Sequence, residues 1–393
     1  MIILRTVKNI SSLNIAASVL LFLAAILAAV VANSSLSPVY QDFLLQELHL
    51  RIGNFNLFSH GGHPLKMIEF INDCLMTVFF LAVGLEIKRE LLVGELSSVR
   101  KAALPFIAAC GGMVVPVVIY ALSVASGTPE TRGMAIPMAT DIAFSLGVLS
   151  LLGKRVPLSL KIFLTAFAVV DDIGGILVIA LFYSADVAYG YLIAAAVLYV
   201  FLYYMGKFGV TQKIFFLFFG VIIWYLFLQS GIHSTISGVI LAFVIPARPR
   251  LDAGKYIERI RDIIGEFPLS KSDNIVLTNA QIATLKQVER ASDYVISPLQ
   301  SLEDNLHGAV SFVILPLFAF ANAGVVFSGS GSIVGDVSIA VAAGLLLGKF
   351  LGIYLFTWLA VKSGVALMPA GMNWKNIAGV SLLGGIGSVS YTH

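Results

Sequence analysis

The chain has 393 residues, of which 58% are hydrophobic and only 12% are charged, with a formal net charge of +3. A soluble protein of this length could not bury so much apolar surface, so the composition excludes a soluble protein. It predicts an all-α polytopic membrane protein. The two cysteines, Cys74 and Cys110, both fall in apolar runs, so neither a disulfide framework nor a bound metal is expected.

Apolar segments of helical length recur along the whole chain. The predicted membrane helices cover about residues 13–33, 66–87, 102–125, 133–152, 160–183, 187–205, 213–229, 232–246, 305–326, 337–361 and 376–387. Most Lys and Arg residues fall in alternate connections, which places the N-terminus and those connections in the cytoplasm. We therefore predict a single transmembrane domain, residues 1–393.

The first connection, residues 38–64, has the pattern of a small β-hairpin on the outer face. Gly53 and Asn54 lie between two short apolar runs, and such a pair favours a tight turn between strands. An isolated hairpin is marginally stable, so we expect it to pair with a second copy across a dimer. A disordered outer loop is the alternative.

Two of the predicted helices are interrupted. The segment 133–152 contains Pro137 and the pair Thr140–Asp141, and the segment 376–387 stops at a glycine-rich run. Non-helical backbone at membrane depth survives only where it lines a cavity or packs against protein. Unwound carbonyls beside the Asp141 carboxylate are suitable ligands for an alkali cation. The alternative is that Asp141 only caps a half-helix.

Asp171 and Asp172 lie near the middle of the segment 160–183. A charged residue at this depth costs roughly 2.5–3.5 kcal/mol on insertion scales, so its presence predicts a functional site. Adjacent residues on a helix point about 100° apart. One carboxylate is therefore expected to meet a fixed partner and the other a water-filled cavity. Lys349, near the centre of the segment 337–361, is the predicted partner, in an ion pair that protonation can break.

Charged residues also gather at the predicted cytoplasmic boundary. Lys88 lies there together with the candidate pH-sensing residues Glu86, Arg89, Glu90, Glu303 and His307. Glu303 and His307 are one helical turn apart, and the histidine would give sensitivity near neutral pH. The alternative is a solvated cluster of helix-end charges. From its surroundings alone, His233 is expected to be a polar contact between helices.

Residues 247–304 form a predicted cytoplasmic insertion. Its second part carries apolar residues at helical spacing, namely Leu285, Val288, Val295, Leu299 and Leu302. This spacing predicts helical structure that lies along the membrane surface or against the ends of the membrane helices.

Several motifs resemble those of the NhaA family of bacterial sodium/proton antiporters. In family order they are Gly84–Leu91, Ala139–Phe144, Val170–Gly174, Gly231–Thr235, Leu315–Gly324 and Gly348–Lys349. The resemblance implies an inverted-repeat antiporter fold in which two broken helices cross at mid-membrane. It also implies a bacterial inner-membrane location.

The resemblance implies roles for the polar residues as well. Asp171 and Asp172 would bind Na⁺, with Thr140 and Asp141 beside them and Lys349 as the countercharge. Asp73 would lie on the periplasmic pathway. The cytoplasmic cluster would match the family's pH-sensing region, and His233 a position linked to the pH response.

The end of the chain departs from the family pattern. After Gly387 it reads Ser388–His393, where the family continues with a second half-helix and a further span. We therefore expect a truncation within the broken helix 376–387 and, with it, weak or absent transport.

The predicted function is electrogenic, pH-regulated exchange of Na⁺ (or Li⁺) for H⁺. No cofactor and no enzymatic activity are expected, since no phosphate-binding loop, metal cluster or nucleophile triad is found in the sequence. A proton-coupled symporter of a small solute and a transport-inactive homologue are the alternatives.

Overall fold

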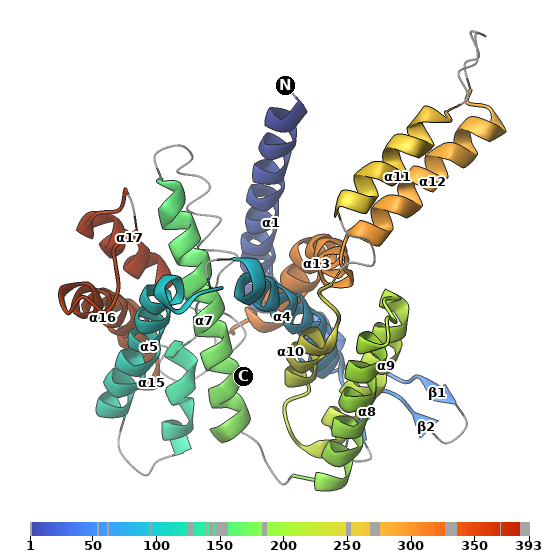
Figure 1. The fold of residues 1–393 in the computed structure, drawn as a ribbon. Coiled ribbons are helices and arrows are strands. Elements are labelled where there is room, and N and C mark those ends of the chain that lie inside the picture. The colour runs from blue at the N-terminus through green and yellow to red at the C-terminus, as the bar shows by residue number, and fades with distance from the viewer. Residues whose placement is uncertain are drawn as a thin grey trace.

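The computed structural model describes residues 2–52, 55–60, 63–94, 96–124, 129–138, 140, 145, 156–182, 187–248, 253–267, 276–326, 336–369 and 371–385. The described chain is almost entirely helical, which confirms the predicted fold class. Its helices pack into two groups that contact each other mainly through α4 (Met76–Val93) and α7 (Leu158–Phe182) (Figure 1).

The first group, called the α4 group, fills the centre and right of Figure 1. Besides α4 it contains α1 (Ile2–Ala32), α2 (Ser37–Leu45), α3 (Met67–Glu69), the π-helical turn η1 (Phe70–Leu75), α8 (Tyr189–Lys207), α9 (Lys213–Ser230), α10 (Thr235–Val244), α13 (Pro298–Ala309), the π-helical turn η4 (Val310–Ile314) and α14 (Leu315–Asn322).

The second group, called the α7 group, lies on the left of Figure 1. Besides α7 it contains α5 (Val99–Ser123), the 3₁₀-helical segment η2 (Pro129–Met138), α15 (Asp336–Ala343), the π-helical turn η5 (Gly344–Lys349), α16 (Phe350–Lys362) and α17 (Trp374–Gly384). Of the predicted interrupted segment 133–152, only residues 133–138, Thr140 and Ser145 are described. Asp141 lies outside the described residues.

Helix α4 contributes to the apolar cores of both groups. Leu81 and Leu85 belong to a buried cluster with α8, α9, α10 and α13, whereas Val83 and Ile87 belong to one with α5, α7 and α16. Residues two positions apart on a helix point about 200° apart, so the two pairs occupy opposite faces. A helix that is apolar on both faces is buried on both faces.

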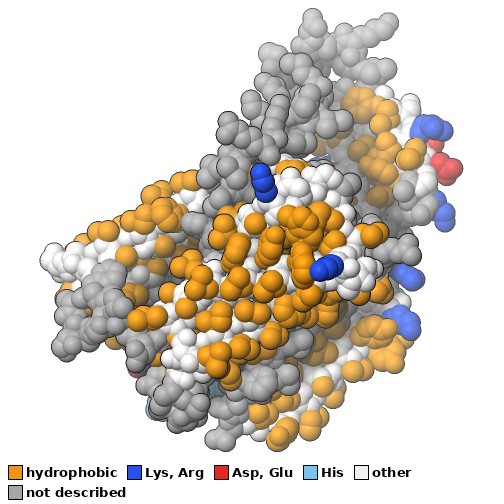
Figure 2. Space-filling view, turned by 90° about the vertical axis from the view of Figure 1, so that its left-hand side faces the viewer, with side chains coloured by type: hydrophobic (Ala, Val, Ile, Leu, Met, Phe, Trp, Pro, Cys, Tyr) orange, Lys and Arg blue, Asp and Glu red, His pale blue; other side chains and the backbone are white. Residues whose placement is uncertain are grey.

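The composition of the helices fits a membrane protein. Of the helices that the structure describes, six are long and apolar enough to span a bilayer, and a bent pair formed by α1 and α2 makes a seventh candidate. The outward surface of α5, η5 and α16 exposes large apolar side chains, including Leu122, Leu346 and Leu359. Figure 2 shows this side of the molecule as a broad apolar surface with few charged side chains.

The close packing of the α7 group depends on glycine. A Cβ atom on Gly111 of α5 would lie 2.3 Å from the backbone oxygen of Gly352 in α16. No larger side chain fits at that separation, so the two backbones touch directly. This contact fixes the position of η5, which immediately precedes α16 and ends in Lys349.

The predicted outer β-hairpin is present. Strand β1 (Arg51–Ile52) pairs antiparallel with β2 (Phe55–Asn56), with Ile52 opposite Phe55, and the predicted turn residues Gly53 and Asn54 lie outside the described residues. A second short pair, β3 (Ser59–His60) with β4 (His63–Pro64), was not predicted. Two-residue strands carry little sequence signal because their pairing depends on the turn and on neighbouring structure.

The predicted insertion, residues 247–304, contains a helical hairpin. Helices α11 (Ala253–Gly265) and α12 (Asn279–Val295) pack against each other and project away from the rest of the molecule (Figure 1). The predicted run of apolar residues divides between two helices, because the chain leaves helical geometry at Ile296 and restarts at Pro298. Leu299 and Leu302 are buried against the membrane helices, whereas Leu285 is 45% exposed on α12.

Candidate functional site

Asp171 and Asp172 have different surroundings, as their helical spacing predicts. Helix α7 is continuous through both residues. The Asp171 side chain is buried, and its Oδ2 atom accepts a hydrogen bond of 2.6 Å from Lys349 Nζ. Asp172 is half-buried and interacts electrostatically with the same ammonium. Asp171 therefore holds the fixed partner, while Asp172 is the more accessible carboxylate.

Lys349 ends the π-helical turn η5 and has no exposed surface. Its ammonium donates a second hydrogen bond, of 2.6 Å, to Thr140 Oγ1. A buried ammonium is tolerable only when it is paired and hydrogen-bonded, and both conditions are met here. The predicted ion pair is thus present, and it includes a hydroxyl from the interrupted segment.

Thr140 extends the network to the end of another helix. Its hydroxyl accepts from Lys349 and donates to the backbone oxygen of Gly384, 3.0 Å away. Ser145 Oγ donates to the oxygen of Leu383 at 2.9 Å. Gly384 is the last residue of α17, where carbonyl groups have no partner within the helix. Thr140 and Ser145, both from the predicted interrupted segment, are therefore bonded to the end of α17.

The oxygens gathered at this network are suitable for a small cation. Alkali and alkaline-earth cations take carboxylate, hydroxyl and carbonyl oxygens. Asp171 supplies Oδ2 to Lys349, while its Oδ1 atom has no hydrogen-bond partner within the described chain. A buried carboxylate oxygen without a donor is costly, and a bound cation or proton would satisfy it.

Asp73 lies in a second polar site, in the π-helical turn η1 near the start of α4. Its Oδ1 atom accepts from Ser234 Oγ at 3.0 Å, and its backbone oxygen accepts from Trp224 Nε1 at 3.2 Å. His233, on the neighbouring connection between α9 and α10, is exposed and interacts electrostatically with Asp73. The structure thus brings these two predicted residues together, away from the Lys349 network.

A pair of amides beside Asp73 was not predicted. Asn72 and Asn322 exchange hydrogen bonds of 3.2 and 2.8 Å, which connect η1 to the end of α14. Both residues lie in predicted membrane helices, 66–87 and 305–326, but a neutral amide in an apolar run does not indicate its partner. Only the packing of α14 against η1 identifies the partner of each amide.

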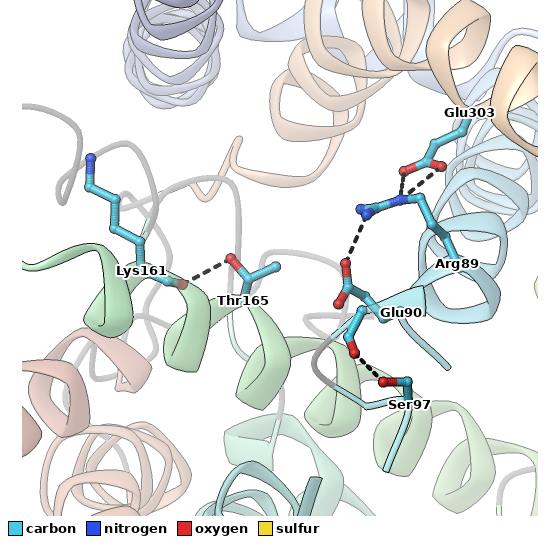
Figure 3. A network of polar contacts seen from close by, with 7 residues as sticks. Arg89, Glu90, Ser97, Lys161, Thr165 and Glu303 are labelled. Atoms are coloured by element: carbon cyan, nitrogen blue, oxygen red, sulfur yellow. Dashed lines mark hydrogen bonds and ion pairs between the residues drawn. The ribbon is translucent and has the colours of Figure 1, made fainter. Parts of the chain in front are cut away.

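The predicted cytoplasmic cluster is largely assembled. Arg89 Nε lies 2.9 Å from Glu303 Oε1, and Arg89 Nη1 lies 2.9 Å from Glu90 Oε1. Figure 3 shows Arg89 of α4 between the two carboxylates, one from its own helix and one from α13. Glu86 interacts electrostatically with Arg89, Glu90 and Glu303. His307 is exposed and forms no side-chain hydrogen bond or ion pair with the other described residues.

Lys88 is not part of that cluster, which corrects its predicted place. Its ammonium donates to the backbone oxygens of Ala242, at 3.3 Å, Phe243, at 2.7 Å, and Ile245. All three donors of the ammonium are thus used on the C-terminal end of α10, where the helix dipole favours a positive charge. Lys88 therefore joins α4 to α10.

Two packed groups of apolar helices, with a buried Asp–Lys pair between α7 and η5, define a polytopic membrane protein of the transporter class. The chain belongs to the family described as Na⁺/H⁺ antiporter 1, whose family model matches residues 8–390.

Named relatives support this membership. The Na(+)/H(+) antiporter NhaA of Bacteroides thetaiotaomicron is 74% identical over 98% of this chain and 88% of its own length. The protein of the same name from Bacteroides fragilis is 75% identical over 98% of this chain and 89% of its own length. The protein of the same name from Parabacteroides distasonis is 50% identical over 98% of this chain and 86% of its own length.

Proposed function

We propose that this protein exchanges Na⁺ for H⁺ and that Asp171, Asp172, Thr140 and Lys349 form its transport site. Membership of an antiporter family and relatives named as Na(+)/H(+) antiporters support the exchange. The single observation that carries the site is the buried Lys349–Asp171 pair bonded to Thr140. Asp141 adjoins Thr140 in the sequence and is proposed as a further ligand.

Competition between Lys349 and Na⁺ for the same carboxylate would couple the two ions. In the proton-loaded state Asp171⁻ pairs with Lys349⁺ while Asp172 carries a proton, and the site is neutral. Loss of one proton from Lys349 and one from Asp172 leaves both carboxylates free for Na⁺. The empty site then carries two negative charges, and it carries one after Na⁺ has bound. Two protons are thus exchanged for one Na⁺, so transport is electrogenic and responds to membrane voltage.

Alternating access would come from movement of the α7 group against the α4 group. The hydrogen bonds and ion pairs described above each join members of a single group. Where α4 meets α7, the contact is made by apolar side chains such as Val83, Ile87 and Leu164. An apolar contact can slide without breaking a polar bond, whereas each group is internally fixed. The Lys349 network lies wholly in the α7 group and would move with it.

Regulation and assembly complete the proposal. The cluster of Glu86, Arg89, Glu90 and Glu303, with His307 one turn further along α13, would sense cytoplasmic pH. His233 and Asp73 would tune the opposite, periplasmic side. The protein would lie in the bacterial inner membrane with its N-terminus in the cytoplasm, since most Lys and Arg residues fall on that side. It would form a homodimer through the β1–β2 hairpin.

A direct experiment is proton movement in everted membrane vesicles, followed with a pH-sensitive dye. Addition of Na⁺ or Li⁺ alone should discharge the proton gradient in vesicles that contain the protein and not in vesicles that lack it. A response that required an added organic solute would indicate symport, and no response to either would contradict transport. Repeating the measurement with and without an imposed membrane voltage tests the two-for-one exchange.

A further inference from the structure

A groove lies between the ends of α1 and α14 and the short helix α2. It has a volume of about 380 Å³ and is lined by Val31, Leu36, Val39, Tyr40, Phe43 and Phe320. The lining carries no charged residue, and the one polar group, the Tyr40 hydroxyl, donates to the backbone oxygen of Phe320 at 2.6 Å. The groove therefore offers a ligand only apolar contact.

The depth of the groove follows from the helices that form it. Val31 is one residue from the end of α1, and Phe320 is two residues from the end of α14, at Asn322. Both helices belong to candidate membrane spans. Helix α2 is bent by 113° from α1, so it runs across the ends of the spans instead of continuing through the bilayer. The groove thus lies where the hydrocarbon layer meets the headgroups.

Helix α2 divides its apolar surface between the protein and this groove. Tyr40 and Leu44 are buried against α1 and α14, whereas Val39 is 65% exposed and Phe43 is 40% exposed. Gln41, on the opposite side of the helix, is exposed as well. An amphipathic helix of this kind lies in the interface plane, with its apolar side toward the acyl chains.

We propose that this groove binds an acyl chain of an outer-leaflet phospholipid. A hydrocarbon chain needs no polar partner, and acyl chains surround the groove at this depth. A protein partner is less suited to it, because protein interfaces carry hydrogen bonds across them, and the side chains of this lining offer no free donor.

The groove also connects to the outer end of the α4 group. Tyr40 stacks edge-on against Phe320, with ring centroids 5.2 Å apart, and its hydroxyl also lies 3.3 Å from the oxygen of Ala321. The next residue, Asn322, is bonded to Asn72 in η1, beside Asp73. A bound chain would thus touch Tyr40, whose side chain holds the end of α14.

The test is retention of phospholipid by the purified full chain in detergent, measured by native mass spectrometry during titration with dioleoyl phosphatidylethanolamine. The wild type should keep one phospholipid per protomer more tightly than the rest. Val39→Trp fills the groove and Val39→Ser removes apolar contact, so each should weaken that binding by about tenfold. Leu45→Trp is the matched control, since Leu45 is 54% exposed on the same helix outside the groove.

Three results would overturn the proposal. The first is wild-type retention in both Val39 variants, with their thermal unfolding unchanged. The second is binding of dioleoyl phosphatidylglycerol only, which has the same chains and would indicate recognition of an anionic headgroup. The third is loss of a dimer in the Val39 variants with lipid retention unchanged, which would assign the groove to a second copy. The proposal is supported if the wild type retains phosphatidylethanolamine and phosphatidylglycerol equally well and Leu45→Trp does the same.

Discussion

Lys349 Nζ lies 2.6 Å from Asp171 Oδ2, and neither side chain is exposed. The two residues are far apart in the sequence and reach each other from η5 and α7. Removal of one partner from such a pair leaves an uncompensated buried charge, whereas the pair itself can be close to neutral for stability. This asymmetry makes the pair a suitable element for a protein that must break and re-form it.

The two partners should therefore be coupled in their effect on stability. Asp171→Asn and Lys349→Met should each lower the free energy of unfolding by about 3–5 kcal/mol. The double variant should lose less than the sum of the two, by about 1–3 kcal/mol. Thermal or denaturant unfolding in detergent measures this cycle. Strictly additive losses would show that the pair does not form in the detergent-solubilised protein.

Asp172→Asn should abolish Na⁺-dependent proton movement while the protein remains inserted and folded. The amide keeps the shape of the side chain but can neither bind Na⁺ strongly nor release a proton. Vesicle assays of dye response, with protein content measured in parallel, test this. Asp262→Asn, at an exposed position on α11, is the matched control and should transport like the wild type. Transport by the Asp172 variant at the wild-type rate would remove this residue from the site.

Thr140→Val should weaken both the ion-pair network and its link to α17. The substitution keeps the volume but removes the acceptor used by Lys349 and the donor used by Gly384. A loss of about 1–3 kcal/mol in unfolding free energy is expected, because both partners remain buried. Thr357→Val is the control, since Thr357 is buried and its hydroxyl has no hydrogen-bond partner within the described chain. The free energy of unfolding of that variant should be unchanged or slightly higher than that of the wild type.

Arg89→Gln should change the pH profile of transport more than its maximum rate. The substitution leaves Glu90 and Glu303 without their cation, and removal of a nearby positive charge favours the protonated form of a carboxyl group. If deprotonation of this cluster activates transport, the profile moves to higher pH. Rates of Na⁺-dependent proton movement across a pH series provide the measurement. Arg290→Gln, at an exposed position on α12, should leave the profile where it is.

Gly111→Ala should destabilise the α7 group. The added methyl group would lie 2.3 Å from the oxygen of Gly352, so α5 and α16 must separate. A loss of about 1–3 kcal/mol is expected from overpacking. Gly379→Ala in α17 meets no atom within 4 Å and should gain up to about 1 kcal/mol of helix propensity. Comparison of the two melting temperatures tests whether stability depends on the close approach of α5 to α16 and not on the number of glycines.

The sequence by itself determined the class of protein and the charged centre of its site. A bilayer core accepts only backbone that satisfies its own hydrogen bonds, so apolar segments of sufficient length had to be helices. The same solvent makes each buried charge expensive, so Asp171 and Lys349 could be predicted as partners. The pairing of β1 with β2 was predictable because the turn preference of Gly53 and Asn54 is local.

The tertiary structure decided which partners the remaining polar groups take. Lys88 sits among charged residues in the sequence, yet its ammonium caps α10 because that helix end packs beside it. The contact of Thr140 with Gly384 and the exchange between Asn72 and Asn322 depend on helices remote in the chain. A hydroxyl or an amide has many acceptable partners of similar energy, so sequence leaves the choice open. Packing makes that choice, because it brings only a few of these partners within hydrogen-bond distance.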